Sequence, residues 1–299
     1  MKTIFNLTKR NIKMFFKDKG MFFTSMITPL ILLVLYATFL AKVYKDTFIS
    51  NLPEGFEVSN NLINGLVAGE LFSSLLAVSC ITVAFCANLL IVQDKVNGAR
   101  KDFLITPVKE SHLSLSYYLG TLFTTLIVSL VATIVCFIYV AFSGWYISFV
   151  DVLLIFLDIF MLTMFGTALA SIVNSFLSTN GQASLVGTIV SAGYGFICGA
   201  YMPISQFGQG LQHVLSFLPG TYGTSLLRNH ALNGVFKEMA TQGFSLEVIE
   251  KIKDSIDCNL YFFNNKVEIY AMYLILIGSI ILLLGAYVLI NMLRKKKKV

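Results

Sequence analysis

The sequence predicts an all-α membrane protein with six transmembrane helices, and three observations support this fold class. Of the 299 residues, 56% are hydrophobic and only 13% are charged, whereas a soluble domain carries about 25% charged residues. The apolar residues cluster in runs of the roughly 20 residues that a helix needs to cross a bilayer. The net charge of +6 lies in short segments beside these runs, which indicates a membrane surface and not nucleic acid as its partner.

The first 20 residues predict a separate unit, an amphipathic helix that lies in the membrane interface. At about 100° per residue the side chains divide into an apolar side and a basic side. The apolar side holds Ile4, Phe5, Leu7, Ile12, Met14, Phe15 and Phe16, and the basic side holds Lys2, Lys9, Arg10, Lys13 and Lys17. A mitochondrial presequence is the alternative, but presequences are rich in Arg and this segment runs directly into an apolar span.

Residues 21–299 then form the transmembrane domain. Its six candidate spans are residues 21–42, 66–92, 115–142, 150–173, 183–202 and 269–291. The N-terminal segment, residues 93–114 and the C-terminal tail together hold 15 cations and four anions, while the segments on the opposite side are richer in acids. Because short cytoplasmic segments carry an excess of Lys and Arg, both termini and residues 93–114 are expected in the cytoplasm.

Residues 203–268 form the longest stretch outside the spans. Their first part is apolar but is interrupted by Pro and Gly, so we expect a re-entrant hairpin that enters the membrane from the outside. Further on, Ser245 is expected to cap a short external helix. The apolar face of that helix holds Val248, Ile249, Ile252 and Ile256.

The sequence holds no catalytic motif that would make this chain an enzyme. It lacks the G-x-x-x-x-G-K-[ST] loop that binds nucleotide phosphates, the H-E-x-x-H zinc motif and the G-x-S-x-G nucleophile elbow. Its three histidines are isolated and its five cysteines have no C-x-x-C spacing, so no metal site is predicted. The energy for uphill transport would come from another polypeptide or from an ion gradient.

Two acidic residues, Glu70 and Asp158, lie in or near the predicted spans. A charged group within a bilayer is costly, so both are candidates for a translocation path. Glu70 could instead be hydrated at the outer interface, and Asp158 could form a structural hydrogen bond to a neighbouring helix. The sequence leaves these alternatives open.

Four small residues at a spacing of four form a stripe on the fifth predicted span. They are Gly187, Ser191, Gly195 and Gly199. Small side chains allow helices to approach closely, either within one bundle or between two subunits. The spacing alone does not distinguish these two arrangements.

Residues 93–114 contain the most informative loop, QDKVNGARKDFLITPVKESHLS. A short helix is expected from Asp94 to about Thr106, where Pro107 stops it. An apolar patch in this charged loop fits docking onto a soluble partner, and contact with the membrane surface is the alternative. The patch consists of Phe103, Leu104 and Ile105.

These features together resemble the membrane subunit of ABC-2-type transporters, a permease family of drug, polysaccharide and lipid exporters. The resemblance covers nearly the whole chain in order and spacing. Its local matches are Asp94 with Asn97-Gly98 and Phe103-Leu104-Ile105-Thr106-Pro107-Val108, then Gly199-Ala200-Tyr201-Met202-Pro203-Ile204, then Leu218-Pro219-Gly220-Thr221-Tyr222 and Leu227-Arg228. The chain departs from the family pattern at Gln93-Asp94-Lys95, where members often have Glu-x-Glu or Glu-Arg.

The resemblance implies a complex of two permease chains, identical or homologous, with two ABC ATPase subunits. ATP and Mg²⁺ would bind to the partner ATPase, and this chain would hold no cofactor. The residues expected to couple to the ATPase are Asp94, Asn97, Gly98, Arg100, Lys101, Phe103, Leu104 and Pro107. Those that mark the re-entrant hairpin are Pro203, Pro219, Tyr222 and Arg228.

The implied function is export of a drug, peptide or lipid-like cargo across the plasma membrane of a bacterium, with lipid around the chain and no nucleic-acid partner. The main alternative is a stand-alone channel or ion-coupled transporter that uses Glu70 and Asp158. A membrane scaffold without a transport role is the third. Co-purification of an ATP-binding protein would separate them.

Overall fold

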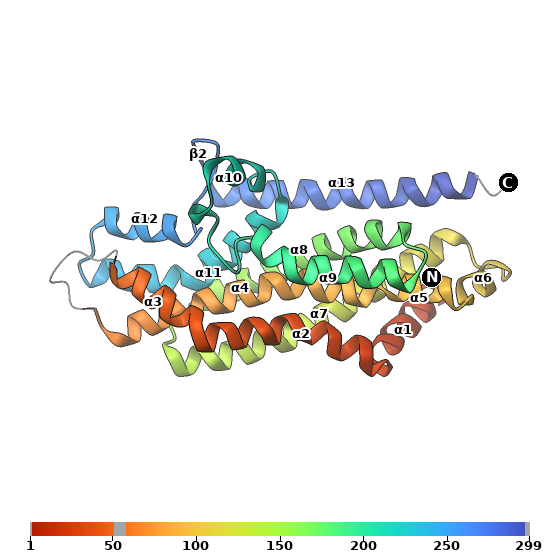
Figure 1. Cartoon of the computed structure of the whole chain (residues 1–299), viewed down its shortest axis with the longest axis horizontal. Helices are drawn as coiled ribbons and strands as arrows, with labels where there is room; N and C mark the ends of the chain where they lie inside the picture. The colour runs from red at the N-terminus through yellow and green to blue at the C-terminus, as the bar shows by residue number, and fades with distance from the viewer. Residues whose placement is uncertain (1, 51–57, 297–299) are drawn as a thin grey trace.

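The computed structural model describes residues 2–50 and 58–296 as an elongated bundle of helices (Figure 1). In chain order the elements are α1 (Lys2–Lys17), α2 (Lys19–Leu35), η1 (Tyr36–Leu40), α3 (Ala41–Ser50), α4 (Asn60–Asn88), α5 (Leu90–Val96), α6 (Ala99–Leu104), α7 (Glu110–Ser143), α8 (Phe149–Phe176), α9 (Asn180–Ile197), η2 (Ile204–Gln206), α10 (Gln209–Leu215), α11 (Pro219–Thr241), α12 (Leu246–Ser255), β1 (Leu260–Phe262), β2 (Asn265–Val267) and α13 (Ile269–Lys296). The last part of the basic tail, Lys297 and Lys298, lies outside the described residues.

Five helical stretches of the described chain are long and apolar enough to cross a membrane, which confirms an all-α, multi-pass membrane protein. They are Lys19–Asp46, Asn60–Val96, Glu110–Ser143, Phe149–Phe176 and Ile269–Leu293. The predicted span 183–202 corresponds to α9, which begins with a polar turn at Asn180 and is not among these five. A sixth crossing therefore stays a prediction.

The two ends of the bundle carry different segments. Figure 1 places the N-terminus, α6 and the C-terminal end of α13 at one end, here called the loop end. It places α3 and α12 at the opposite end, here called the far end. The termini and residues 93–114 therefore share one side, as the charge pattern requires. That this side is the cytoplasm stays a prediction.

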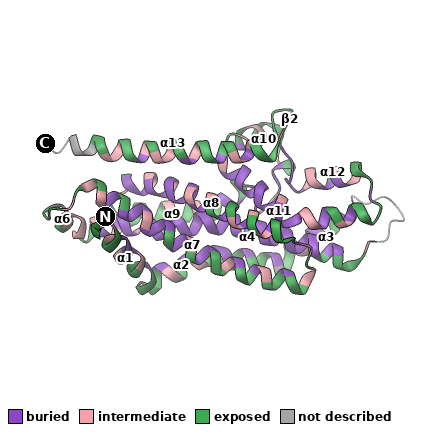
Figure 2. Cartoon of the chain, turned by 180° about the vertical axis from the view of Figure 1, so that it is seen from behind, coloured by how far each residue is buried: buried purple, intermediate pink, exposed green. Residues whose placement is uncertain are grey.

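Helix α4 forms the core of the bundle, and nearly all of its residues are buried (Figure 2). It packs against α2, α7, α8 and α11. Gly166 of α8 lies directly against the backbone of Cys80 and Ile81, where a side chain would collide. Lipid tails are as apolar as the side chains, so the hydrophobic effect does not drive helices together within a membrane. The van der Waals contacts that close approach allows hold them together instead.

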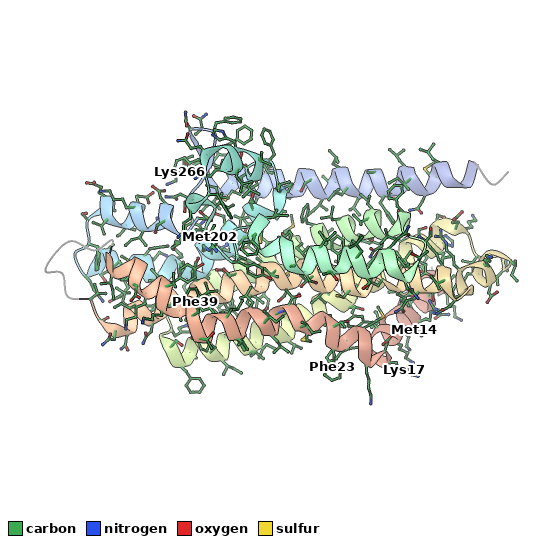
Figure 3. The ribbon with its side chains drawn as sticks, in the orientation of Figure 1. Met14, Lys17, Phe23, Phe39, Met202 and Lys266 are labelled. Carbon is green, nitrogen blue, oxygen red and sulfur yellow. The ribbon has the colours of Figure 1, made fainter. Side chains whose placement is uncertain are left out.

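The outer faces of the peripheral helices are apolar, in contrast to those of a soluble bundle. Phe142 at the end of α7 is 89% exposed, and Leu282 of α13 is 70% exposed. Phe23 projects away from the bundle near the corner between α1 and α2 (Figure 3). Continuous exposed apolar faces of this kind need lipid around them.

Helix α1 has the predicted basic and apolar sides and, in addition, a buried face that the sequence did not indicate. Thr8, Asn11 and Phe15 are buried, and the helix packs against α7. The side-chain amide of Asn11 donates a hydrogen bond to the Ser116 carbonyl at 3.0 Å. Phe5 is 67% exposed. A location in the membrane interface stays a prediction for this exposed apolar side.

The segment after α9 folds back on itself. Gly199 adopts φ +75°, a left-handed conformation that glycine takes without strain, and the chain then forms η2 and α10 before α11 begins at Pro219. Proline suits this first helical position, because its missing N–H has no partner there in any helix. Two short helical elements thus precede α11, and a re-entrant hairpin that enters the membrane stays a prediction.

Helix α12 confirms the helix predicted to begin after Ser245. The Ser245 hydroxyl accepts a hydrogen bond from the Val248 amide at 3.3 Å, and Ile249 and Ile252 are buried. The two-stranded antiparallel hairpin β1–β2 was not predicted. Its strands are only three residues long, too short for an alternating pattern to be recognised in the sequence.

Candidate functional site

The predicted coupling loop consists of two helices, so the prediction of one helix from Asp94 to about Thr106 is wrong. Helix α5 ends at Val96 and α6 begins at Ala99. Between them Gly98 adopts φ +81°, which breaks the helical path and is favourable only for glycine. The Asn97-Gly98 pair is a turn signal that the sequence already contained.

Asp94 is buried inside this chain and does not face a partner. It is 3% exposed, and its carboxylate pairs with Arg10 of α1, with an Nη2–Oδ1 distance of 2.8 Å. The Tyr117 hydroxyl of α7 donates to the other carboxylate oxygen at 2.5 Å. The hydrogen bonds to Asp94 raise the pKa of Arg10 above its ordinary value, so the guanidinium stays charged. Asp94 therefore joins α1, α5 and α7.

Two further cations fix the loop to neighbouring helices. The Lys95 ammonium donates to the carbonyls of Asn174, Ser175 and Leu177 at the end of α8, at 2.7 to 3.2 Å. A cation at a helix C-terminus is favourable because the last carbonyls lack helical partners. Arg100 of α6 pairs with Glu110 of α7 at 3.1 Å. The loop is thus held by α1, α7 and α8 together.

Among the described large apolar residues of the loop Ile105 is the most exposed, with 86% of its surface accessible, and Val96 follows with 44%. Phe103 is half-buried, and the Arg10 guanidinium lies over its ring at 5.2 Å from the centroid. The side chain of Leu104 lies outside the described residues. Asn97, Lys101 and Pro107 are also exposed. The surface offered by the loop consequently differs from the patch that the sequence predicted.

Asp158 has partners on two other helices. Its Oδ2 lies 2.6 Å from Nδ1 of His230 in α11, and its Oδ1 accepts a hydrogen bond from the Tyr273 hydroxyl of α13 at 2.5 Å. The carboxylate is fully buried. The structural hydrogen bond that the sequence left open is therefore present. A role for Asp158 in a translocation path stays a prediction.

Glu70 is also fully buried and is not hydrated at a surface of the described structure. The Nε atom of Arg228 lies 2.8 Å from Oε2 of Glu70, within ion-pair distance. The angle between these groups does not meet the geometry of a hydrogen bond. Arg228 also donates from Nη2 to the Ser74 hydroxyl at 3.1 Å and to the Gly199 carbonyl at 3.0 Å. Its Nη1 lies 3.7 Å from Asp257. This arginine links α4, α11 and the turn after α9.

The other residues of the predicted hairpin hold its turns. Pro203 is buried and precedes η2, and Pro219 opens α11. The Tyr222 hydroxyl donates to the Ser216 carbonyl at 2.5 Å, which ties the first turn of α11 to the end of α10. Tyr222 is 2% exposed. These three residues thus shape the hairpin from inside the chain.

The predicted stripe of small residues does not form one helix face. Gly187 and Ser191 line a groove of about 870 Å³ whose walls come from α2, the α4–α5 region and α9. A side chain at Gly195 would collide with the Tyr201 ring, so this residue packs within the chain. Gly199 lies beyond the end of α9, in the left-handed turn described above. The four-residue stripe was wrong because the helix ends before its last member.

A comparison with protein families assigns most of the chain to one of them. The family model described as ABC-2 type transporter matches residues 2–231, from α1 into α11. The chain belongs to the ABC-2 type transporter family. A comparison with curated proteins gives no match. The matched family is one of transporter membrane domains, so the chain is a membrane permease and not a catalytic domain.

Several residues of this ABC-2 permease acquire partners that sequence analysis missed. His230 was considered only as one of three isolated histidines and Arg10 only as part of a basic face, and Asp257 was not singled out. Each pairs with a residue at least 29 positions away. Helical periodicity places a residue on a face but does not identify the helix that the face meets. A buried acid needs a partner, so Asp158 and Glu70 were the available signals that polar residues on other helices face them.

Proposed function

We propose that this permease is the membrane subunit of an ABC exporter and that separate ATPase subunits dock on the α5–α6 loop. The observation that carries the proposal is a loop with an exposed tip and a fixed base. The tip presents Ile105 beside Lys101, while Asp94 and Lys95 fix the base to other helices. An apolar anchor with a polar rim is the usual composition of a docking surface.

A fixed base is what a coupling element needs. A displacement of α6 by an ATPase would be carried to α1 through the Arg10–Asp94 pair and to α8 through Lys95. Buried ion pairs and packed helices transmit displacement because they tolerate few alternative arrangements. A loop tethered only at its two ends would absorb the same displacement. Hydrolysis of ATP, with Mg²⁺, would occur on the partner.

The groove between α2 and α9 supports the proposal that a second permease chain, identical or homologous, completes the route. A side chain added at Gly187 would meet nothing within 4 Å, so this part of α9 is not packed within its own chain. Ile27, Ile31 and Leu35 give the groove an apolar α2 wall. Apolar walls favour a drug, peptide or lipid-like cargo, exported across the plasma membrane of a bacterium.

Co-purification tests the ATPase partnership. The tagged full-length chain is isolated from native membranes, and the ATP-binding protein recovered with it is quantified. Ile105→Ala should weaken the affinity for the ATPase about tenfold and so reduce its recovery, because the variant removes most of an apolar side chain that docking would bury. Phe103→Ala should also weaken association or uncouple hydrolysis from transport, because the ring holds Arg10 in place.

Lys109→Ala is the matched control, because this residue lies beyond Pro107 and outside the proposed tip. It should have a much smaller effect. Wild-type recovery, ATPase rate and transport in both Ile105→Ala and Phe103→Ala would show that this loop is not the coupling element.

An ion-coupled transporter that uses Glu70 and Asp158 is the second candidate, since both acids are buried within the bundle. Each of them already has a partner within the chain, Arg228 and His230, which reduces its capacity to bind an ion. Reconstituted vesicles separate the two functions. An ABC exporter requires ATP and works without an ion gradient, whereas the second candidate requires the gradient and ignores ATP.

A further inference from the structure

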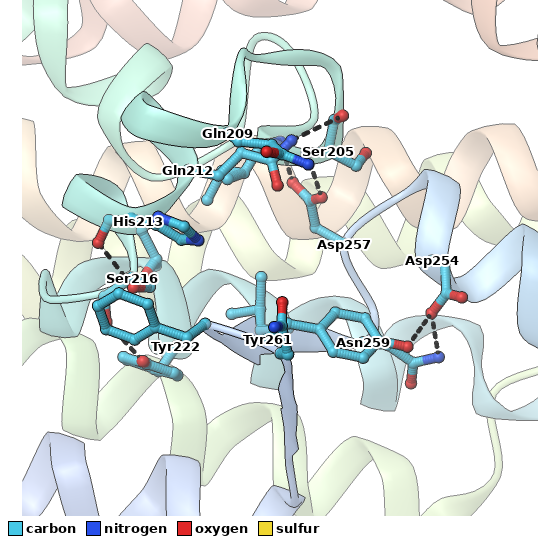
Figure 4. A pocket seen from close by; sticks show the side chains of 15 residues that line it. Ser205, Gln209, Gln212, His213, Ser216, Tyr222, Asp254, Asp257, Asn259 and Tyr261 are labelled. Carbon is cyan, nitrogen blue, oxygen red and sulfur yellow. Dashed lines mark hydrogen bonds between the residues drawn. The ribbon is translucent and has the colours of Figure 1, made fainter.

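A polar cavity of about 490 Å³ lies between the α10 region and the β1–β2 hairpin (Figure 4). One wall carries Ser205, Gln209 and Gln212, and the opposite wall carries Asp254 and Asn259. Its volume is within the range of small-molecule sites. Most of the second wall lies beyond residue 231, where the family match ends. We propose that this cavity binds a small organic cation, an ammonium group attached to an apolar body.

The charge of the walls points to a cation. Two carboxylates, Asp254 and Asp257, line the cavity, and none of the described residues that line it is Lys or Arg. Both hydrogen bonds that Asp254 accepts, from Asn259 at 2.7 Å and Tyr261 at 3.0 Å, fall on Oδ1. A carboxylate has about four acceptor sites, so its Oδ2 is open to a donor from a ligand.

The cations around the cavity are bound elsewhere. Lys253 and Lys266 both donate to Glu250, at 3.0 and 2.8 Å, and neither comes within 4.0 Å of Asp254. Arg228 lies 2.8 Å from Glu70 and 3.7 Å from Asp257, so one guanidinium serves two acids. Among the described residues Asp254 therefore has no ion-pair partner, and a cationic ligand would supply it.

The remaining walls suit the apolar body of such a ligand. Tyr222, Tyr261 and Phe263 line the cavity, and the His213 ring lies 4.6 Å from that of Phe263, centroid to centroid. Tyr222 and Tyr261 are held in place by their hydroxyl hydrogen bonds to Ser216 and Asp254. Fixed aromatic faces attract ammonium groups through the ring quadrupole and accept an aromatic body at little entropic cost.

A ligand in this cavity would also contact the buried ion network. Asp257 lines the cavity, and the backbone amides of Ile204 and Ser205 donate to its two carboxylate oxygens. It lies 3.7 Å from Arg228, which pairs with Glu70 of α4. An ammonium group beside Asp257 would compete with Arg228 for this carboxylate. The cavity is consequently connected by charge to the centre of the bundle.

Calorimetry with phenethylammonium chloride tests the proposal on the full chain in lipid nanodiscs. Saturable binding is expected, and Asp254→Asn should weaken it about tenfold or more, because hydrogen bonds to charged groups contribute more than neutral ones. The asparagine keeps the Oδ1 acceptor for Asn259 and Tyr261. Phe263→Ala removes a ring and no charge, and it should also weaken phenethylammonium binding. This second variant tests the proposal if Asp254→Asn does not fold.

Two controls test whether binding depends on the location of the carboxylate and on the charge of the ligand. Glu247→Gln removes a charge from the same helix outside the cavity, where the Glu247 side chain is 77% exposed, and should leave binding unchanged. Phenylacetate has the same ring and the opposite charge and should not bind. The proposal is overturned by absence of saturation with phenethylammonium up to about 10 mM, by equal binding of phenylacetate, or by wild-type affinity in both variants.

Discussion

His230 and Asp158 lie 2.6 Å apart in the interior of the bundle, and the Tyr273 hydroxyl donates to the free oxygen of the same carboxylate. One buried acid thus joins α8, α11 and α13. The connection matters most for α13, because its outer surface is largely exposed and it lies beyond the family match. An acid in an apolar run therefore has a structural task here, whatever part it takes in transport.

Removal of this carboxylate should destabilise the protein. Asp158→Ala leaves the buried His230 ring and the Tyr273 hydroxyl without their shared partner, and each unsatisfied buried polar group costs about 1–3 kcal/mol. Tyr273→Phe removes a single hydrogen bond and should cost about 1 kcal/mol. Thermal unfolding of the purified chain in detergent measures both. Asp46→Ala removes an exposed carboxylate and should have little effect.

Asp158→Asn separates structure from transport. The amide preserves an acceptor for Tyr273 and the shape of the side chain, so the fold should survive. If the carboxylate lines the route, transport or cargo-stimulated ATPase activity falls while assembly stays normal. Unchanged transport with normal expression would restrict Asp158 to the structural task.

Loss of the Arg10–Asp94 pair should release α1 from the loop. In Asp94→Ala the half-buried guanidinium loses its carboxylate partner and keeps only the hydrogen bond to Asn11, and Tyr117 loses its acceptor as well. Backbone amides of residues 2–17 should then exchange with deuterium faster, because local opening becomes less costly. Lys9→Ala removes an exposed cation from the same helix and should not change exchange. Equal protection of α1 in Asp94→Ala and the wild type would contradict this role.

The sequence predicted elements whose cause is local. The helical periodicity of apolar and basic residues predicts α1, the Ser245 hydroxyl predicts the start of α12, and long apolar runs predict the spans. Pairings between distant helices were beyond it. Arg228 and Glu70 are 158 positions apart, and no periodicity indicates that α11 turns this arginine toward α4.

The predicted coupling loop also combines features that the sequence predicts with features that it does not. Its location between the second and third spans followed from charge and Pro107, whereas its exposed surface did not. Phe103 is covered by Arg10 from α1, a helix nearly a hundred residues away in sequence, and Ile105 is left exposed. Which apolar residue of this short segment faces outward depends on tertiary contacts that a single sequence does not contain.

The link between α12 and the β hairpin should depend on pH through Glu250. Hydrogen bonds from Lys266 and then from Lys253 and Asn259 outweigh partial burial and lower the pKa of this carboxyl from 4.5 to about 2. A lowered pKa in the folded state stabilises the fold above pH 4.5, and this contribution is lost as the pH falls toward 2. Because the group is partly solvated, we expect at most about 1 kcal/mol.

Comparison of Glu250→Gln with the wild type isolates this contribution. The wild type should unfold at the higher temperature at pH 6, and the difference should shrink as the pH falls below 4.5. Glu247→Gln, with an exposed pair to Lys251 on the same helix, serves as the control. A difference between Glu250→Gln and the wild type that stays constant from pH 6 to about pH 3 would show that the carboxylate charge is not responsible.

The charge distribution predicts the orientation of the bundle in the membrane, and cysteine labelling tests this prediction. All five native cysteines are buried, so an impermeant maleimide should give little background. Lys251→Cys lies at the far end, where the Lys251 side chain is 68% exposed, and Lys101→Cys lies on exposed α6 at the loop end. Since Lys and Arg concentrate in cytoplasmic segments, Lys251→Cys should react in intact cells.

Lys101→Cys should react only after the membrane is permeabilised. Its labelling in permeabilised cells also shows that this thiol is able to react with the maleimide. Labelling of Lys101→Cys alone in intact cells would reverse the orientation and would place the α5–α6 loop out of reach of any cytoplasmic ATPase.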